Sequence, residues 1–158
     1  MRLTRNLTQD TTRTNHPRRL EPGGYLEIHD NCFPVRCDDS TITEETPIHR
    51  WTELLIQATD AINRPITIAP RWKEMMEAAG FEDVVVQRDV WPINKWARDK
   101  KLKELGGWAQ ASSLQGVEAM TLALFTRVLG WSAEETTVFC AEVRKDFKNF
   151  GLHGYWDV

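Results

Sequence analysis

Residues 20–30 read LEPGGYLEIHD, a Pro-Gly-Gly turn followed by a short alternating run that ends in His29 and Asp30. Proline presets one backbone angle of a tight turn, and glycine accepts the left-handed conformations that other residues avoid. The alternation of apolar and polar residues after the turn is typical of a β-strand. Because such a turn often leads into a strand of an α/β protein, we predict a strand over residues 24–30, close to the start of the chain.

The length and composition predict a single globular domain. A chain of 158 residues can bury roughly 70% of its unfolded surface, and it is short for two domains. Hydrophobic residues make up 41% and charged residues 27% of the chain, which are ordinary values for a globular protein. No apolar run is long enough to cross a bilayer, so we expect no membrane partner. The seven tryptophans are interpreted as core residues and pocket walls.

Charge divides the chain into a basic head and an acidic body. Residues 1–20 carry a balance of +4 and the rest of the chain carries −7. The body has no basic stripe, which argues against a nucleic-acid partner. The Arg- and Thr-rich head shares its composition with mitochondrial transit peptides, but Leu3 and Leu7 are too few for an amphipathic helix. We favour a disordered tail or a mis-assigned start over residues 1–19, with a transit peptide as the alternative.

The cysteines favour a reducing intracellular setting. Cys32, Cys37 and Cys140 are odd in number and form no C-x-x-C pair, so a disulfide framework is not expected. His29 lies within nine residues of Cys32 and Cys37, which raises the question of a metal site. No fourth ligand follows at zinc-like spacing, so we predict that no metal is bound there.

Two helices and a second strand follow the first strand in the pattern. Apolar residues at helical spacing predict a helix over residues 51–62, and a second helix is expected from about Pro70 to Gly80. Glycine at the end supplies a left-handed C-terminal residue. The run FEDVVVQRDVW at 81–91 is rich in valine and predicts a strand buried on both faces. The order strand, helix, helix, strand indicates an α/β fold.

The remainder of the chain is predominantly helical in pattern. A polar connection that starts at Trp91 leads to a helix over residues 106–130, whose apolar residues occupy more than one face, so we expect it to be buried or covered by another element. Ser132 and Glu135 form a capping-box pattern at the start of the next helix. Its predicted inner face consists of Phe139, Cys140, Val143 and Phe147, and the chain then ends in an extended stretch, HGYWDV.

Six segments together resemble one protein family. They are LEPGGYLEIHD, WTELL, WKEMMEAAGFEDV, WPINKWARDKKLKELGGW, ALFTRVLGWSAEE and VRKDFKNFGLHGYW. In their order and spacing, residues 20–158 resemble the C-terminal half of fungal class I S-adenosylmethionine-dependent methyltransferases of the type that regulates secondary metabolism. The resemblance implies a partial Rossmann-like α/β fold that starts at strand five, is rich in helix and has few strands. It also implies a short antiparallel strand at residues 155–158 between the two strands above, and a helical substrate cap over about 91–130.

The resemblance also implies S-adenosylmethionine as cofactor, and here the sequence departs from the family. The family binds the methionine carboxylate on a Gly-rich loop after its first strand, where backbone amides are presented without side chains. The nine glycines form no G-x-G sequence. We therefore predict no cofactor-binding residues in this chain and do not expect it to bind the cofactor or to catalyse methyl transfer alone.

Two functions remain open from the sequence. One is a methyltransferase whose missing strands belong to a longer gene product or to another polypeptide, acting on a small-molecule or protein acceptor. The other is a non-catalytic interaction protein, or a gene-model fragment, derived from such an enzyme. Because a strand without neighbours favours association, we expect a homo-oligomer or a protein partner. The resemblance implies a cytoplasmic or nuclear location.

Five residues are candidates for a substrate pocket. His29 and Asp30 end the first predicted strand, where α/β proteins bind ligands, although an aspartate there also commonly caps a loop. Trp91, Trp96 and Trp108 could stack on a flat substrate or cover the core. No catalytic residue is predicted, because transfer from a sulfonium depends mainly on alignment. His49 and His153 are interpreted as surface or packing residues, and the acids at 38–45 as a solvated loop.

Overall fold

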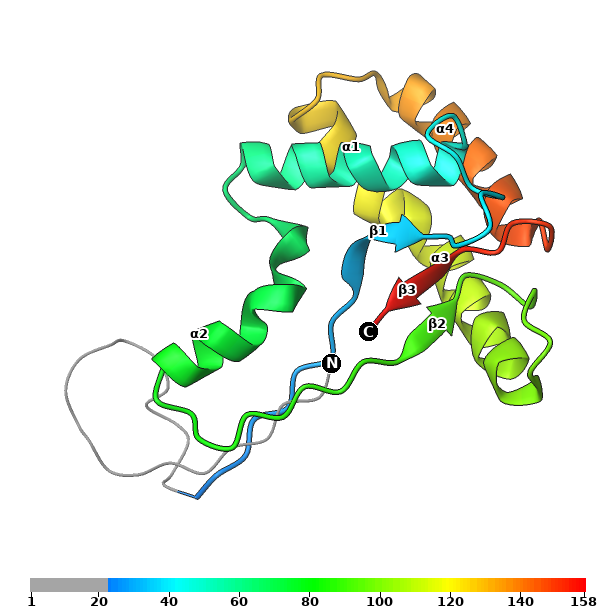
Figure 1. Cartoon of the computed structure of the whole chain (residues 1–158). Coiled ribbons are helices and arrows are strands. Elements are labelled where there is room, and N and C mark those ends of the chain that lie inside the picture. Colours follow the sequence, from blue (N-terminus) through cyan, green and yellow to red (C-terminus); the bar gives the residue numbers. More distant parts are fainter. Residues whose placement is uncertain (1–22) are drawn as a thin grey trace.

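The computed structural model describes residues 23–158, so the predicted tail at 1–19, with its transit-peptide alternative, lies outside the described residues. A small sheet packs against a group of helices (Figure 1). In chain order the elements are β1 (Cys32–Arg36), α1 (Pro47–Ala61), the 3-10 helix η1 (Ile66–Arg71), α2 (Trp72–Ala78), β2 (Val90–Pro92), α3 (Lys100–Arg127), α4 (Ala133–Lys148) and β3 (Tyr155–Asp157). The expected helix-rich chain with few strands is confirmed.

The C-terminal strand β3 lies in the middle of the sheet. The strand order is β1-β3-β2, and β3 is antiparallel to both neighbours. Asp157 is paired with Cys32 on one side and with Val90 on the other. The prediction of a short antiparallel strand at the C-terminus, between the two earlier strands, is therefore confirmed.

The predicted bounds of the two earlier strands are wrong. β1 begins at Cys32 rather than within residues 24–30, and β2 is limited to Val90–Pro92 instead of spanning 81–91. Backbone pairing requires a partner, and β3 is only three residues long. Regular strands therefore form only where the chain passes beside β3, and the alternating run at 24–30 is extended without belonging to this sheet.

The run at 81–91 is not buried on both faces, which corrects a second prediction. Val85 and Val90 are 59% and 41% exposed, whereas Val84 and Val86 pack against the buried side chain of Phe81. Among residues 23–158, the short helix α2 covers one face of this segment. In Figure 1 the segment runs beside residues 24–30, and Leu26 and Ile28 of that run join the same small cluster. The alternating pattern thus identified the inward side chains, although the backbone forms no regular strand there.

The main core lies between α1, α3 and α4. The side chains expected on the inner face of α4 are all buried: Phe139, Cys140, Val143 and Phe147. The predicted capping box is formed, because Ser132 Oγ accepts from the Glu135 backbone N–H at 3.1 Å and a Glu135 carboxylate oxygen accepts from the Ser132 N–H at 2.9 Å. Gly80 follows α2 with a φ of 83°, in the left-handed conformation predicted for it.

The long helix α3 starts earlier than predicted and is covered on one side only. Asp99 Oδ1 accepts a hydrogen bond from the Leu102 N–H at 2.9 Å, so the helix begins at Lys100 inside the expected polar connection. Val117 and Phe125 are buried, but Met120 is 47% exposed. Some of the apolar residues predicted to be covered therefore face solvent, because no element packs on that side within residues 23–158.

Two glycines of α3 provide a matched test of the packing around this helix. A Cβ on Gly106 would lie 2.1 Å from the backbone oxygen of Asn94, whereas a Cβ on Gly116 would meet nothing within 4 Å. We expect Gly106→Ala to destabilise the fold by about 1–3 kcal/mol, because the backbone of the buried residue Asn94 must move. Gly116→Ala should stabilise it by about 0.5–1 kcal/mol through helix propensity. Urea unfolding measures the change in the free energy of unfolding for each variant. Changes of the same sign in the two variants would contradict this packing.

A buried hydrogen bond joins α1 to α3. The Trp51 indole N–H donates to Thr121 Oγ1 at 2.8 Å, and both residues are almost fully buried. Thr121→Val keeps the shape but leaves the indole N–H unpaired, so we expect a loss of about 1–3 kcal/mol in the free energy of unfolding. Thr126→Val is the control, because the Thr126 hydroxyl donates to the Leu122 carbonyl in the same helix without an indole partner. Equal losses in the two variants would contradict a role for the indole bond.

Candidate functional site

His29 and Asp30 follow the extended run at 24–30 and have local partners. His29 Nε2 lies 2.9 Å from a carboxylate oxygen of Glu27 in an exposed pair. Asp30 Oδ2 accepts from the Trp72 indole N–H at 2.8 Å, and its Oδ1 accepts from the Asn31 N–H at 2.9 Å. The Asp30 carboxylate therefore anchors α2 to the extended segment that precedes β1.

The three candidate tryptophans lie in different surroundings. Trp91 belongs to β2, is paired with Trp156 and packs against the main core. The Trp96 indole N–H donates to the Gly154 carbonyl at 2.8 Å, whereas Trp108 on α3 is 71% exposed. Among residues 23–158, no hydrogen bond, ion pair or ring contact joins these tryptophans to His29 or Asp30. Their role in a substrate pocket stays a prediction.

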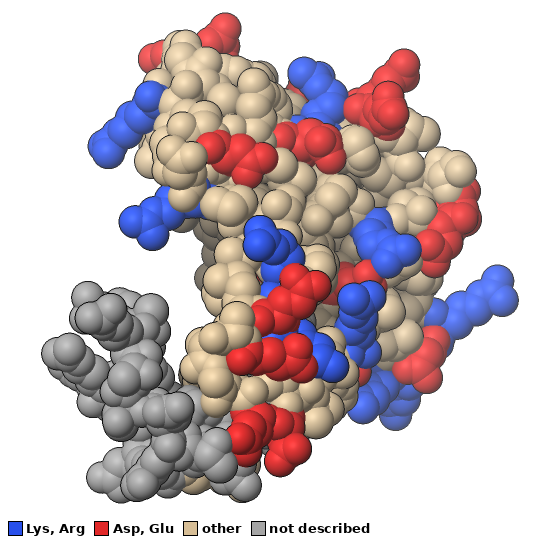
Figure 2. All heavy atoms as spheres, turned by 60° about the vertical axis from the view of Figure 1, so that its left-hand side comes forward, with Lys and Arg blue, Asp and Glu red and all other residues tan. Residues whose placement is uncertain are grey.

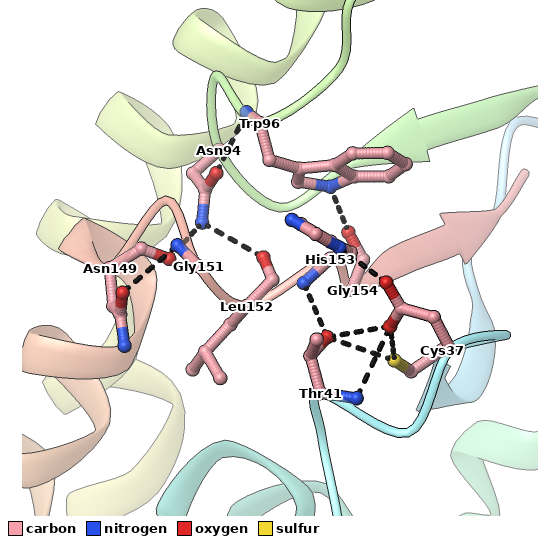
Figure 3. Close-up of polar contacts among 10 residues, drawn as sticks. Cys37, Thr41, Asn94, Trp96, Asn149, Gly151, Leu152, His153 and Gly154 are labelled. Atoms are coloured by element: carbon pink, nitrogen blue, oxygen red, sulfur yellow. Dashed lines mark hydrogen bonds and ion pairs between the residues drawn. The ribbon is translucent and has the colours of Figure 1, made fainter.

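A polar cluster that the sequence did not reveal is centred on Asp39. Its partners Cys37, Thr41 and His153 are labelled in Figure 3. Asp39 Oδ1 accepts from Thr41 Oγ1 at 2.8 Å and from Cys37 Sγ at 3.2 Å, and its Oδ2 contacts His153 Nδ1. The His153 backbone N–H donates to Thr41 Oγ1 at 2.9 Å. The sequence alone indicates a solvated acid at Asp39 and a surface or packing histidine at His153. They are 114 residues apart in the chain, so no local spacing could have predicted their contact.

The same close-up shows how the neighbouring loops are held. The buried Asn94 side chain donates from Nδ2 to the Asn149 carbonyl at 3.0 Å and accepts at Oδ1 from the Trp96 N–H at 3.0 Å (Figure 3). The Trp96 and His153 rings lie 5.1 Å apart. The loops that contain Asp39, Asn94 and Asn149 are therefore joined through side chains next to the sheet.

The electrostatics of the Asp39 cluster favour a structural role over a catalytic one. The hydrogen bond from His153, with smaller contributions from Thr41 and Cys37, holds the pKa of the Asp39 carboxyl well below its usual range. The carboxylate contacts both the imidazole and the thiol, whereas an activated thiol requires a base as its own partner. Within residues 23–158 no group of three or more His, Cys, Asp or Glu side chains is arranged to hold a metal ion.

The N-termini of the long helices bear on cofactor binding, because free amides there commonly bind anionic groups. In α1 the Ile48 N–H donates to Asp146 Oδ2 at 2.9 Å, and in α3 the Leu102 N–H donates to Asp99. In α4 the Glu135 N–H donates to Ser132. Each helix of the described chain that is long enough to bind an anion thus uses an N-terminal amide internally. That amide is therefore not open to the carboxylate of S-adenosylmethionine in any of the three helices.

The surface of the described residues includes a small pocket beside the sheet and a larger one beside α1. A pocket of about 240 Å³ lies near the end of β3 and is lined by Cys32, Pro70, Lys73, Val86, Arg88 and Val158. A wider, open pocket of about 610 Å³ lies at the start of α1 and is lined by Glu44, His49, Arg50, Glu53, Leu54 and Trp131. The second is within the size range of pockets that bind small organic molecules.

Acidic and basic side chains are interspersed over the face shown in Figure 2. A helix of sufficient length and apolarity to cross a membrane is not found between residues 23 and 158. Neither observation identifies a partner.

Similarity to named proteins covers most of the chain. It is 38% identical over 139 residues to the probable methyltransferase tdiE of Emericella nidulans, which is 88% of this chain and 44% of that protein. It is 33% identical over 138 residues to the methyltransferase pytC of Aspergillus terreus, 87% of this chain and 43% of pytC. The secondary metabolism regulator laeA of Monascus pilosus is 32% identical over 137 residues, 86% of this chain and 37% of laeA.

These similarities define the class of protein. No family model and no solved structure matches the chain. The chain belongs to the fungal family of methyltransferases and secondary metabolism regulators that tdiE, pytC and laeA represent. It spans less than half the length of each of these curated relatives. The resemblance stated from the sequence is thereby confirmed.

The Asp39 cluster predicts a pH-dependent contribution to stability. Because the pKa of Asp39 is lower in the folded chain than its ordinary value of 3.8, ionised Asp39 stabilises the fold above that pH, and this contribution is lost as the pH falls through the folded pKa. We expect Asp39→Asn to lower the melting temperature at about pH 7 and to have a smaller effect towards about pH 2. Glu104→Gln, which removes an exposed charge on α3, should have little effect at either pH. A constant difference for Asp39→Asn across this range would contradict the prediction.

Proposed function

We propose that residues 23–158 are part of an S-adenosylmethionine-dependent methyltransferase unit linked to fungal secondary metabolism, and that this chain alone does not hold the cofactor. One observation supports the proposal that the chain alone does not hold the cofactor. Asp146, Asp99 and Ser132 each accept a hydrogen bond from an N-terminal amide of a long helix. The proposal that these residues are part of a methyltransferase unit is supported by similarity over 139 residues to a relative named as a probable methyltransferase.

Within such a unit, the described residues would contribute to holding the methyl acceptor. Methyl transfer from a sulfonium releases a neutral group, so the protein mainly has to align the acceptor with the methyl group and exclude water. The region 91–130 is proposed as the substrate cap. It is supported by the position of α3, which is attached to the core along one side and exposes Trp108 and Met120 on its surface. We propose a small molecule or a protein side chain as the methyl acceptor. We also propose a cytoplasmic or nuclear location for the unit.

The cofactor-binding residues would then come from outside this sequence. A longer gene product and a second polypeptide are both compatible with this arrangement, because either could supply glycine-rich amides and a ribose-binding acid. Asp30 is not proposed as the ribose-binding acid, because its two carboxylate oxygens already accept hydrogen bonds from the Trp72 indole N–H and the Asn31 backbone N–H.

A non-catalytic interaction protein is the second candidate. The observation in its favour is the exposure of apolar side chains on the two extended segments, with Tyr25 at 68% and Val85 at 59%. Apolar side chains exposed on extended segments favour association with another chain. A monodisperse monomer in light scattering, with a cooperative thermal transition, would count against this candidate.

Calorimetric titration with S-adenosylhomocysteine tests the proposal, because this product needs no acceptor and cannot react. We expect no saturable heat in the micromolar range from the purified 158-residue chain. Loss of two or three charge-assisted hydrogen bonds, at about 1.5–3 kcal/mol each, weakens binding by several orders of magnitude.

The full-length relative tdiE, titrated in the same buffer, serves as the positive control for the ligand. Saturable binding to the 158-residue chain with low-micromolar affinity would overturn the proposal that this chain alone does not hold the cofactor.

A further inference from the structure

We propose that the open pocket at the start of α1 is a binding site for an arylalkylamine, a ligand with a flat aromatic ring and a cationic amine on a short chain. The pocket lies between residues 44–54 and Trp131, which belongs to the loop between α3 and α4. Its volume of about 610 Å³ accommodates a ligand of this size. The inference concerns binding only, so it does not depend on methyl transfer or on the cofactor.

The aromatic wall of the pocket is fixed before any ligand binds. The Trp131 ring makes T-shaped contacts with Phe125 and Phe139, at 5.0 Å and 5.4 Å between ring centroids. The Trp131 backbone N–H also donates to the Phe125 carbonyl at 3.0 Å. A ring held in this way can contact an aromatic ligand or a cation in the pocket while losing little conformational freedom on binding. Leu54 adds an apolar surface to the same pocket.

The charged side chains of the pocket favour a cation. Glu44 and Glu53 both line it, and neither has a hydrogen-bond or ion-pair partner within residues 23–158. The one arginine of the lining, Arg50, places its guanidinium over the Phe139 ring, 5.6 Å from the centroid. Two carboxylates against one guanidinium leave an excess of negative charge beside the Trp131 ring. An ammonium group can bind there while the ring of the same ligand stacks on the indole.

A set of three probes of similar shape tests this inference on the full 158-residue chain. The probes are 2-phenylethylamine, the neutral 2-phenylethanol and the anionic phenylacetate, titrated at about pH 8, where the first is a cation. Tryptophan fluorescence excited above the absorption of the probes, together with calorimetry, measures binding. We expect saturable binding of the amine, with affinity for phenylacetate lower by a factor of about ten or more.

Charge variants locate the site. Glu53→Gln and Glu44→Gln are each expected to weaken binding of the amine about threefold to tenfold. Glu45→Gln is the matched control, because it removes the same charge from the adjacent residue, which is exposed and outside the pocket lining. Its affinity should stay within about twofold of the original chain. The variants alter exposed side chains, so unchanged melting temperatures can confirm that each one is folded.

Three results would overturn the inference. They are absence of saturable amine binding at millimolar concentration, equal affinities for the amine and phenylacetate, and equal effects of Glu53→Gln and Glu45→Gln. The last would assign the attraction to the overall negative charge of the chain rather than to this pocket. None of these outcomes depends on S-adenosylhomocysteine binding, so the failure of this inference is distinguishable from the failure of the proposed function.

Discussion

The pairing of β3 with both β1 and β2 is the constraint on which the rest of the fold depends. Three residues near the C-terminus, Tyr155–Asp157, join two segments that are far from them in the sequence. Entry into this strand is tightly packed, because a Cβ on Gly154 would lie 2.5 Å from Cδ1 of Ile42 and would require that side chain to shift. The Arg36 guanidinium and the Asp157 carboxylate, 2.6 Å apart, add an ion pair across the β1–β3 edge.

The polar groups next to β3 extend this constraint to the helices. The Gly154 carbonyl accepts from Trp96, and the residue before it, His153, contacts Asp39. Asn94 then connects the loop before α3 to the end of α4 through the Asn149 carbonyl. The helices thereby acquire fixed positions relative to the sheet, and the close approach of Gly106 to the Asn94 backbone is one consequence.

The same internal contacts limit what the described residues can bind. Side chains bonded to α1, α3 and α4 each use one N-terminal amide of the helix, which reduces the number of amides open to an anionic ligand. The pocket at the start of α1 differs, because Glu44 and Glu53 have no partner within residues 23–158. Ligand binding by this chain is therefore expected through the Trp131 ring and these carboxylates rather than through the backbone amides of a helix N-terminus.

The sequence by itself determined the features that depend on neighbouring residues. The capping box of Ser132 and Glu135, the turn at Gly80 and the inner face of α4 all involve partners within one or a few helical turns. The family was also recognisable, because the order of its short motifs is a property of the sequence.

Only the tertiary structure decided where the strands begin and end and which side chains meet. The valine-rich run at 81–91 has a strong strand pattern, but regular pairing exists only where β3 lies beside it. The Asp39–His153 contact and the capping of α1 by Asp146 join residues 114 and 98 positions apart. A backbone hydrogen bond between strands, or a contact between distant side chains, depends on both partners being brought together, and local sequence patterns describe only one partner at a time.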